Sequence, residues 1–114
     1  MTFTLSFLFL SASASDGSLR ISRRKPLTAN VGLVSVGLDT YWKQCPGLLD
    51  DMKRKEDVFA RKVEAHQVKV TRFGMSDNPQ SAKAMVPAMK AADLDILFVD
   101  MVTYATSSTF APFV

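Results

Sequence analysis

Residues 31–38 read Val-Gly-Leu-Val-Ser-Val-Gly-Leu, a short run that is mostly apolar and rich in β-branched side chains. Strands of a parallel sheet are covered by helices on both faces, so they carry such continuous apolar runs instead of an alternating pattern. Residues 94–101 read Leu-Asp-Ile-Leu-Phe-Val-Asp-Met and form the most hydrophobic segment of the chain after residue 30. The two runs predict two buried strands, and we expect residues 94–101 to form the central one.

The chain between these runs has the pattern of a helix, a weaker strand and a second helix. After Pro46 and Gly47, apolar residues recur at helical spacing among charged ones. In residues 67–73, valines alternate with polar side chains, which predicts a strand near the margin of the sheet. Residues 74–79 are then predicted to form a loop. The apolar positions of the first helix are Leu48, Met52, Phe59 and Val63.

The second predicted helix begins after this loop. Asn78 is a suitable N-cap, and Pro79 suits the first helical position. Pro87 lies inside the same segment, where it removes one backbone hydrogen bond and crowds the preceding turn. We therefore expect a kink there or a shorter helix.

Strand, helix, strand, helix and strand in this order predict an α/β fold. We expect a three-layer, open parallel sheet of flavodoxin-like or Rossmann-like type with right-handed crossovers, in one domain over residues 31–114. Three strands would leave a sheet edge bare, and the apolar residues 110–114 stop abruptly. We therefore expect this domain to be partial, truncated at its C-terminus.

Residues 1–30 differ in composition from the rest. Residues 3–10 are apolar and a Ser/Ala run follows at 11–15, as in a signal peptide. The basic residues come after the apolar stretch instead of before it, and that stretch is too short to span a bilayer. We expect a disordered or artefactual leader in a cytoplasmic protein without a membrane partner. A working export signal is the alternative.

Charge and motif content exclude several classes of function. The net charge of +3 comes from residues 1–30, because residues 31–114 hold ten basic and ten acidic side chains. No basic stripe follows, so we expect no nucleic-acid partner. The glycines fit neither a dinucleotide fingerprint nor a P-loop. Cys45 is the single cysteine, so it forms no internal disulfide, and it lies a whole predicted helix away from His66, too far for a nucleophilic pair.

The candidate ligand site lies beyond the carboxyl ends of the strands, where open parallel sheets bind their ligands. Residues 39–44 and 103–108 follow two of these ends, and we predict them to be loops rich in aromatic and hydroxyl groups. Sugar hydroxyls need hydrogen-bonding partners while the sugar C–H face packs on aromatic rings, so this lining suits a sugar. The alternative is that the aromatic rings cover the end of the core and the hydroxyls cap helices. The candidate substrate-binding residues are Asp39, Tyr41, Trp42, Thr103 and Tyr104.

Two segments resemble the L-arabinose isomerase family. Residues 31–42 read Val-Gly-Leu-Val-Ser-Val-Gly-Leu-Asp-Thr-Tyr-Trp, similar to the opening strand and first loop of that family. Residues 91–98, Ala-Ala-Asp-Leu-Asp-Ile-Leu-Phe, and 103–108, Thr-Tyr-Ala-Thr-Ser-Ser, are similar to its third strand and the loop that follows. The segments stand in the family's order and spacing, so the resemblance covers residues 31–114.

The resemblance implies an aldose–ketose isomerase of carbohydrate metabolism, such as arabinose catabolism, that is oligomeric, cytoplasmic and Mn²⁺-dependent. Such enzymes move a proton between C1 and C2 beside a divalent cation held by glutamates and histidines. These residues lie downstream in the family, so we expect this fragment to supply sheet scaffold, subunit contacts and part of the sugar pocket, but no metal ligand and no catalytic residue. The alternative function is a non-catalytic flavodoxin-like module that binds a small ligand or a partner.

Overall fold

The computed structural model describes residues 28–114 and contains one parallel sheet of three strands. The strands are β1 (Asn30–Val36), β2 (Lys69–Ser76) and β3 (Ile96–Met101), in the order β2-β1-β3. Both neighbouring pairs are parallel. The predicted open α/β sheet is therefore confirmed, while the predicted leader lies almost entirely outside the described residues.

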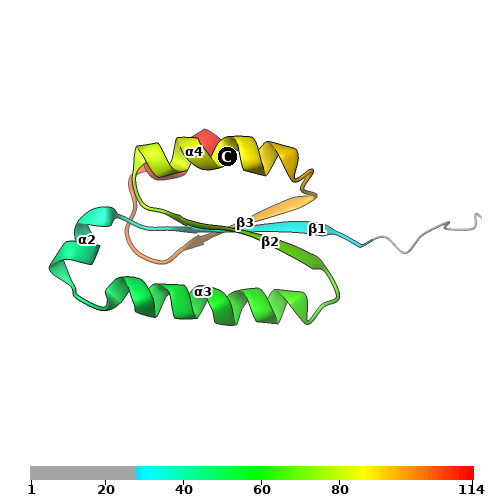
Figure 1. Cartoon of the computed structure of the whole chain (residues 1–114), viewed down its shortest axis with the longest axis horizontal. Helices are drawn as coiled ribbons and strands as arrows, with labels where there is room; N and C mark the ends of the chain where they lie inside the picture. Colours follow the sequence, from blue (N-terminus) through cyan, green and yellow to red (C-terminus); the bar gives the residue numbers. More distant parts are fainter. Residues whose placement is uncertain (1–27) are drawn as a thin grey trace, which may run out of the picture.

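Two long helices cover opposite faces of this sheet (Figure 1). Helix α3 (Leu48–Glu64) connects β1 to β2, and helix α4 (Pro79–Ala91) connects β2 to β3. The chain passes from β1 to β2 in one direction along the sheet, and from β2 back past β1 to β3 in the other. Two right-handed crossovers in opposite directions place their helices on opposite faces of the sheet. The chain then makes two short 3-10 helices, η2 (Ser107–Thr109) and η3 (Ala111–Phe113), and η3 ends beside α4.

The central strand is β1, so the expectation that residues 94–101 form the centre is wrong. Residues 31–36 of β1 are all buried, whereas Ile96 and Met101 at the two ends of β3 are 48% and 56% exposed. The apolar content of a strand reports how much of its surface can be buried. Its place in the sheet depends instead on the direction of the crossovers, which send β3 past β1 to the far side.

Strand β2 lies at the margin of the sheet, as predicted, but it runs on through the predicted loop as far as Ser76. Its register against β1 shifts between Leu33, which faces Arg72, and Val34, which faces Gly74. Gly74 has a φ of +88°, a conformation that suits glycine. A β-bulge at this glycine therefore lets the strand continue where the sequence pattern indicated a turn.

Residues 39–44 form a short helix, α2 (Asp39–Gln44), and not the predicted loop. Gly47 separates α2 from α3 with a φ of +86°. At α4, the side chain of Asn78 accepts a 2.8 Å hydrogen bond from the backbone N–H of Ser81, so the predicted cap is confirmed. The helix is not shortened at Pro87, which is exposed and is followed by four more helical residues.

The core lies between β1 and the two helices. On the α3 side, the rings of Phe59 and Phe98 meet edge to face with their centroids 5.7 Å apart. On the other side, Gly32 leaves room for its neighbours: a methyl group there would lie 2.5 Å from Leu94 and 2.9 Å from Leu97. Among residues 28–114, no helix has the length and apolar character needed to cross a membrane.

Candidate functional site

The carboxyl ends of the three strands are joined by backbone hydrogen bonds. The N–H of Gly37 donates to the carbonyl of Ser76, and the N–H of Val102 donates to that of Val36, each over 3.0 Å. Helix α2 and the chain after β3 consequently lie at the same end of the sheet (Figure 1). We call this end the rim; it comprises residues 37–44, 76–78 and 102–104. The two segments that carry the predicted site residues therefore do share one edge.

Trp42 is held on the rim by a hydrogen bond that crosses from one strand end to another. Its indole N–H (Nε1) donates to Oδ2 of Asp77 over 2.8 Å, and the contact is partly buried. The carbonyl of Asp77 also accepts the backbone N–H of Asp39 at 3.0 Å, which fixes the start of α2. One residue after β2 thus determines both the position of α2 and the orientation of its tryptophan.

Gly37 explains how the tryptophan comes so close to the sheet. A methyl group on Gly37 would lie 2.9 Å from Cζ2 of Trp42 and 3.1 Å from Oγ1 of Thr103. Both distances are shorter than ordinary contacts, so the missing side chain leaves the space that the ring and the hydroxyl fill. Trp42 and Thr103, which come from the ends of different strands, therefore both lie against Gly37.

The other three predicted residues lie around this pair. Asp39 is exposed in the first turn of α2, and Tyr41 is half-buried two residues later. Tyr104 is 69% exposed, and its carbonyl accepts the hydroxyl of Thr103 over 3.0 Å. No hydrogen bond between described residues involves the phenol of Tyr104, and its ring is more exposed than that of Tyr41.

Asp77 is the rim residue that the sequence analysis missed. Its Oδ1 accepts a 3.1 Å hydrogen bond from the side-chain amide of Asn78, while its Oδ2 holds Trp42. The hydroxyl of Ser81 accepts the backbone N–H of Asp77 over 3.1 Å. Asp77 directly follows the observed strand β2, but it falls in the middle of the loop predicted over residues 74–79, and only the ends of the first and third strands were considered.

Glu56 is a second group that the sequence analysis missed. It is 8% exposed, and its Oε2 accepts a 2.8 Å hydrogen bond from the fully buried hydroxyl of Ser35. The signal was again available, since Glu56 follows Met52 by four residues and lies on the apolar stripe of α3. This bond joins β1 to α3 inside the core and takes no part in the rim.

The donor atoms do not fit a manganese site. Within residues 28–114, no three His, Cys, Asp or Glu side chains are grouped so that they could hold a metal ion. The groups that the rim offers to a ligand are an indole, carboxylates and hydroxyls.

Three surface hollows lie away from the rim. Two of them, of about 460 and 450 Å³, follow α3, and one of about 350 Å³ lies between α4 and the chain end. None of the five predicted site residues lines any of these three.

The comparisons with known proteins do not identify a family for this chain. No protein-family model, no curated protein and no solved structure matches it. The likeness of residues 31–42, 91–98 and 103–108 to L-arabinose isomerases therefore remains a hypothesis.

Proposed function

We propose that the rim is the sugar-facing surface of an aldose–ketose isomerase related to L-arabinose isomerase. The observation that carries the proposal is the indole of Trp42, fixed by Asp77 at the carboxyl end of the sheet beside the hydroxyl of Thr103. In open parallel sheets ligands bind at this end. A fixed aromatic ring among short polar groups matches the surface that a polyol requires.

The parts of the rim suit different parts of a sugar. The indole of Trp42 offers an apolar surface for C–H groups, and its N–H is already satisfied by Asp77, so the ring needs no polar partner from the ligand. The exposed carboxylate of Asp39 can accept hydrogen bonds from sugar hydroxyls. Thr103 adds a hydroxyl beside Gly37.

Catalysis in this proposal depends on residues outside the described part of the chain. Isomerisation of an aldose needs a base that moves the proton between C1 and C2 and a group that polarises the sugar oxygens. We expect the glutamates, the histidines and the Mn²⁺ to come from a further region that covers the rim. The chain incubated with L-arabinose and Mn²⁺ should then form no ketose, and turnover by the purified 114-residue chain would contradict this division of roles.

A titration followed through Trp42 tests the sugar site directly. Trp42 is the only tryptophan in the sequence, so intrinsic fluorescence reports on the rim alone. We expect saturable changes in emission with L-arabinose and with ribitol, and none with betaine, which carries no hydroxyl. Thr103→Val should weaken the sugar affinity about three- to tenfold, the range for the loss of one neutral hydrogen bond.

The control is Lys90→Ala, which alters an exposed side chain on α4 and should leave the affinity unchanged. The alternative function is a non-catalytic module that binds some other small polar ligand or a partner at the rim. Saturation by betaine as readily as by sugars would favour that module. A flat response to every probe would remove the rim as a ligand site and leave Trp42 as a cover for the end of the core.

A further inference from the structure

A hollow of about 450 Å³ opens between the second half of α3 and the amino ends of β1 and β3. Val31 and Ile96 stand near the starts of their strands, so the hollow lies at the end of the sheet opposite the rim. We call it the α3–β3 hollow. Its apolar lining residues are Val31, Phe59, Val63, Val68, Ile96 and Phe98.

The α3–β3 hollow holds apolar surface that the rest of the described chain leaves uncovered. Ile96 is 48% exposed, although Val31, its partner in the sheet, is buried. Phe59 and Phe98, which meet edge to face, both line the hollow as well. Its volume lies within the range of about 300–1,000 Å³ that small-molecule sites occupy. An apolar group of ligand size would therefore be buried favourably there.

The two polar residues of the hollow are both basic. Lys62 and His66, one helical turn apart at the end of α3, complete its lining, and no acidic residue lines it. Neither side chain forms an ion pair with a carboxylate of residues 28–114. The ammonium of Lys62 is a full positive charge, and an imidazole carries an N–H donor in each protonation state. The hollow thus offers a positive charge and N–H donors at one end of an apolar surface.

The acidic groups that are close in sequence to this lining are engaged elsewhere. Glu64 lies 4.0 Å from Arg72, on the side of α3 towards β2. Asp95, which directly precedes Ile96, accepts a 2.7 Å hydrogen bond from the backbone N–H of Asn30. Neither carboxylate lines the hollow, so neither neutralises its basic end.

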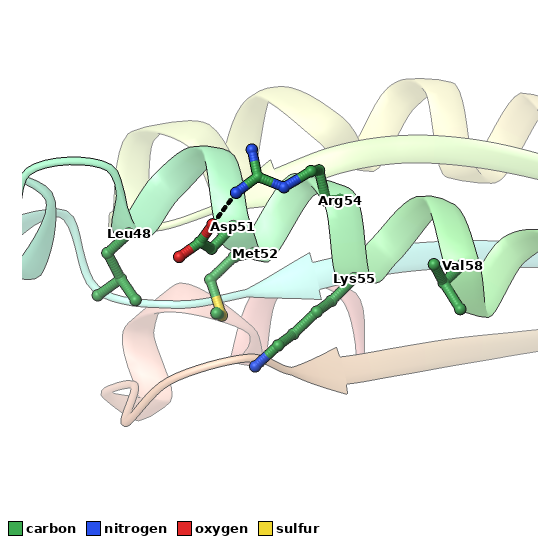
Figure 2. Close-up of a pocket in the computed structure, with 6 residues that line it drawn as sticks. All are labelled: Leu48, Asp51, Met52, Arg54, Lys55 and Val58. Carbon is green, nitrogen blue, oxygen red and sulfur yellow. Dashed lines mark hydrogen bonds and ion pairs between the residues drawn. The ribbon is translucent and has the colours of Figure 1, made fainter.

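The hollow along the first half of α3 has a different lining. Figure 2 shows it, with Asp51 paired to Arg54 and with Lys55 extended beside them. Half of its six lining residues are charged, and they carry both signs. An apolar anion therefore has a better-matched site in the α3–β3 hollow.

We propose that the α3–β3 hollow binds a small amphiphilic carboxylate, with its hydrocarbon chain on the apolar lining and its carboxylate beside Lys62 and His66. The chain is held by burial against the aromatic and aliphatic side chains, and the carboxylate accepts charge-assisted hydrogen bonds. From Phe59 to His66, α3 and its last turn extend about 10 Å at 1.5 Å per residue, close to the length of extended octanoate. The ligand class is therefore that of medium-chain fatty acids.

Solution NMR of the full chain with octanoate as the probe tests this assignment. Octanoate should cause saturable shifts of the methyl signals of Ile96 and Val63 and of the ring signals of His66. The indole signal of Trp42 should not move. Octylammonium carries the same chain with the opposite charge, and it should bind about tenfold more weakly. L-Arabinose should not displace octanoate, so this result does not depend on whether the rim binds a sugar.

Charge reversal at the basic end sharpens the test. Lys62→Glu should weaken the binding of octanoate about tenfold and strengthen that of octylammonium, because attraction becomes repulsion. Lys53→Glu is the matched control: Lys53 is exposed on the same helix but does not line the hollow, so the same charge change should leave both affinities unaltered. Circular dichroism checks that each variant keeps its fold. The comparison of octanoate with octylammonium on the parent chain needs no variant.

Three results would overturn the proposal. The first is equal affinity for octanoate and octylammonium, which would leave an apolar surface without selection for an anion. The second is the absence of saturable shifts up to the solubility limit of octanoate. The third is a shift of the Ile96 methyl signals with chain concentration in the absence of ligand, which would show that a second copy covers the hollow.

Discussion

The two edges of the sheet are protected to very different degrees. Beside β2, Arg72 binds Asp57 and Glu64 of α3, and the bulge at Gly74 breaks the regular ladder. Beside β3, the register against β1 is continuous, and apolar residues at both ends of the strand are half exposed. Proteins block unpaired edges with charges and bulges, because a regular apolar edge accepts further strands or chains. The β2 edge therefore carries more of the features that block further pairing than the β3 edge does.

The largest expected effect comes from Gly32 on the central strand β1, because its neighbours include residues from both the β2 and the β3 sides of the sheet. An alanine methyl there would press on Leu94 and Leu97 from the β3 side and on Phe73 of β2. We expect Gly32→Ala to lower the free energy of unfolding by about 2–3 kcal/mol through overpacking, measured by urea denaturation. Adding Leu94→Val should recover part of this loss, because it shortens the side chain of the closest clash. A variant as stable as the parent would show that the side chains around Gly32 can move apart and accommodate the methyl group.

A smaller effect is expected from the bulge that protects β2. Gly74 has a φ of +88° and no atom within 4 Å of where a methyl group would stand, so Gly74→Ala tests backbone strain alone. We expect a loss of roughly 1–2 kcal/mol by urea denaturation. Gly47→Ala is the matched control, since Gly47 has nearly the same φ and open surroundings outside the sheet. Greater aggregation of Gly74→Ala alone would show that the bulge also guards the edge.

The smallest effect is expected from the ion pairs of Arg72. Its side chain is 35% exposed and its carboxylate partners about half exposed, so solvent screens the attraction. We expect Arg72→Ala to cost less than about 1 kcal/mol, and the cost should shrink in 1 M NaCl. Lys55→Ala on the opposite side of α3 should not change the monomer's stability. A salt-independent loss at Arg72 would mean that packing of its carbon chain, and not charge, closes the β2 edge.

Local sequence patterns predicted which helices and strands form more reliably than they predicted which strands lie next to each other in the sheet. The apolar run at residues 31–38, the helical spacing from Leu48 and the Asn78-Pro79 start each specify structure within a few residues, and all three are confirmed. The edge position of β3 follows from crossovers over two helices, which hydrophobicity does not encode. The bulge at Gly74 was read as a turn because glycine serves in both.

The candidate site was likewise predictable from the sequence only in part. That Trp42 and Thr103 share one edge follows from parallel strands and was predictable. The bond from Trp42 to Asp77 joins residues 35 positions apart, and no sequence spacing indicates it. The helical form of residues 39–44 was hidden because the segment is too short to show a helical period.

The bond between Trp42 and Asp77 also has a consequence for the order of folding. Residue 42 precedes α3 and residue 77 follows β2, so the indole can be anchored only after the chain between them has closed its long loop and β1 has paired with β2. The emission of Trp42 should therefore report the pairing of β1 with β2 during refolding.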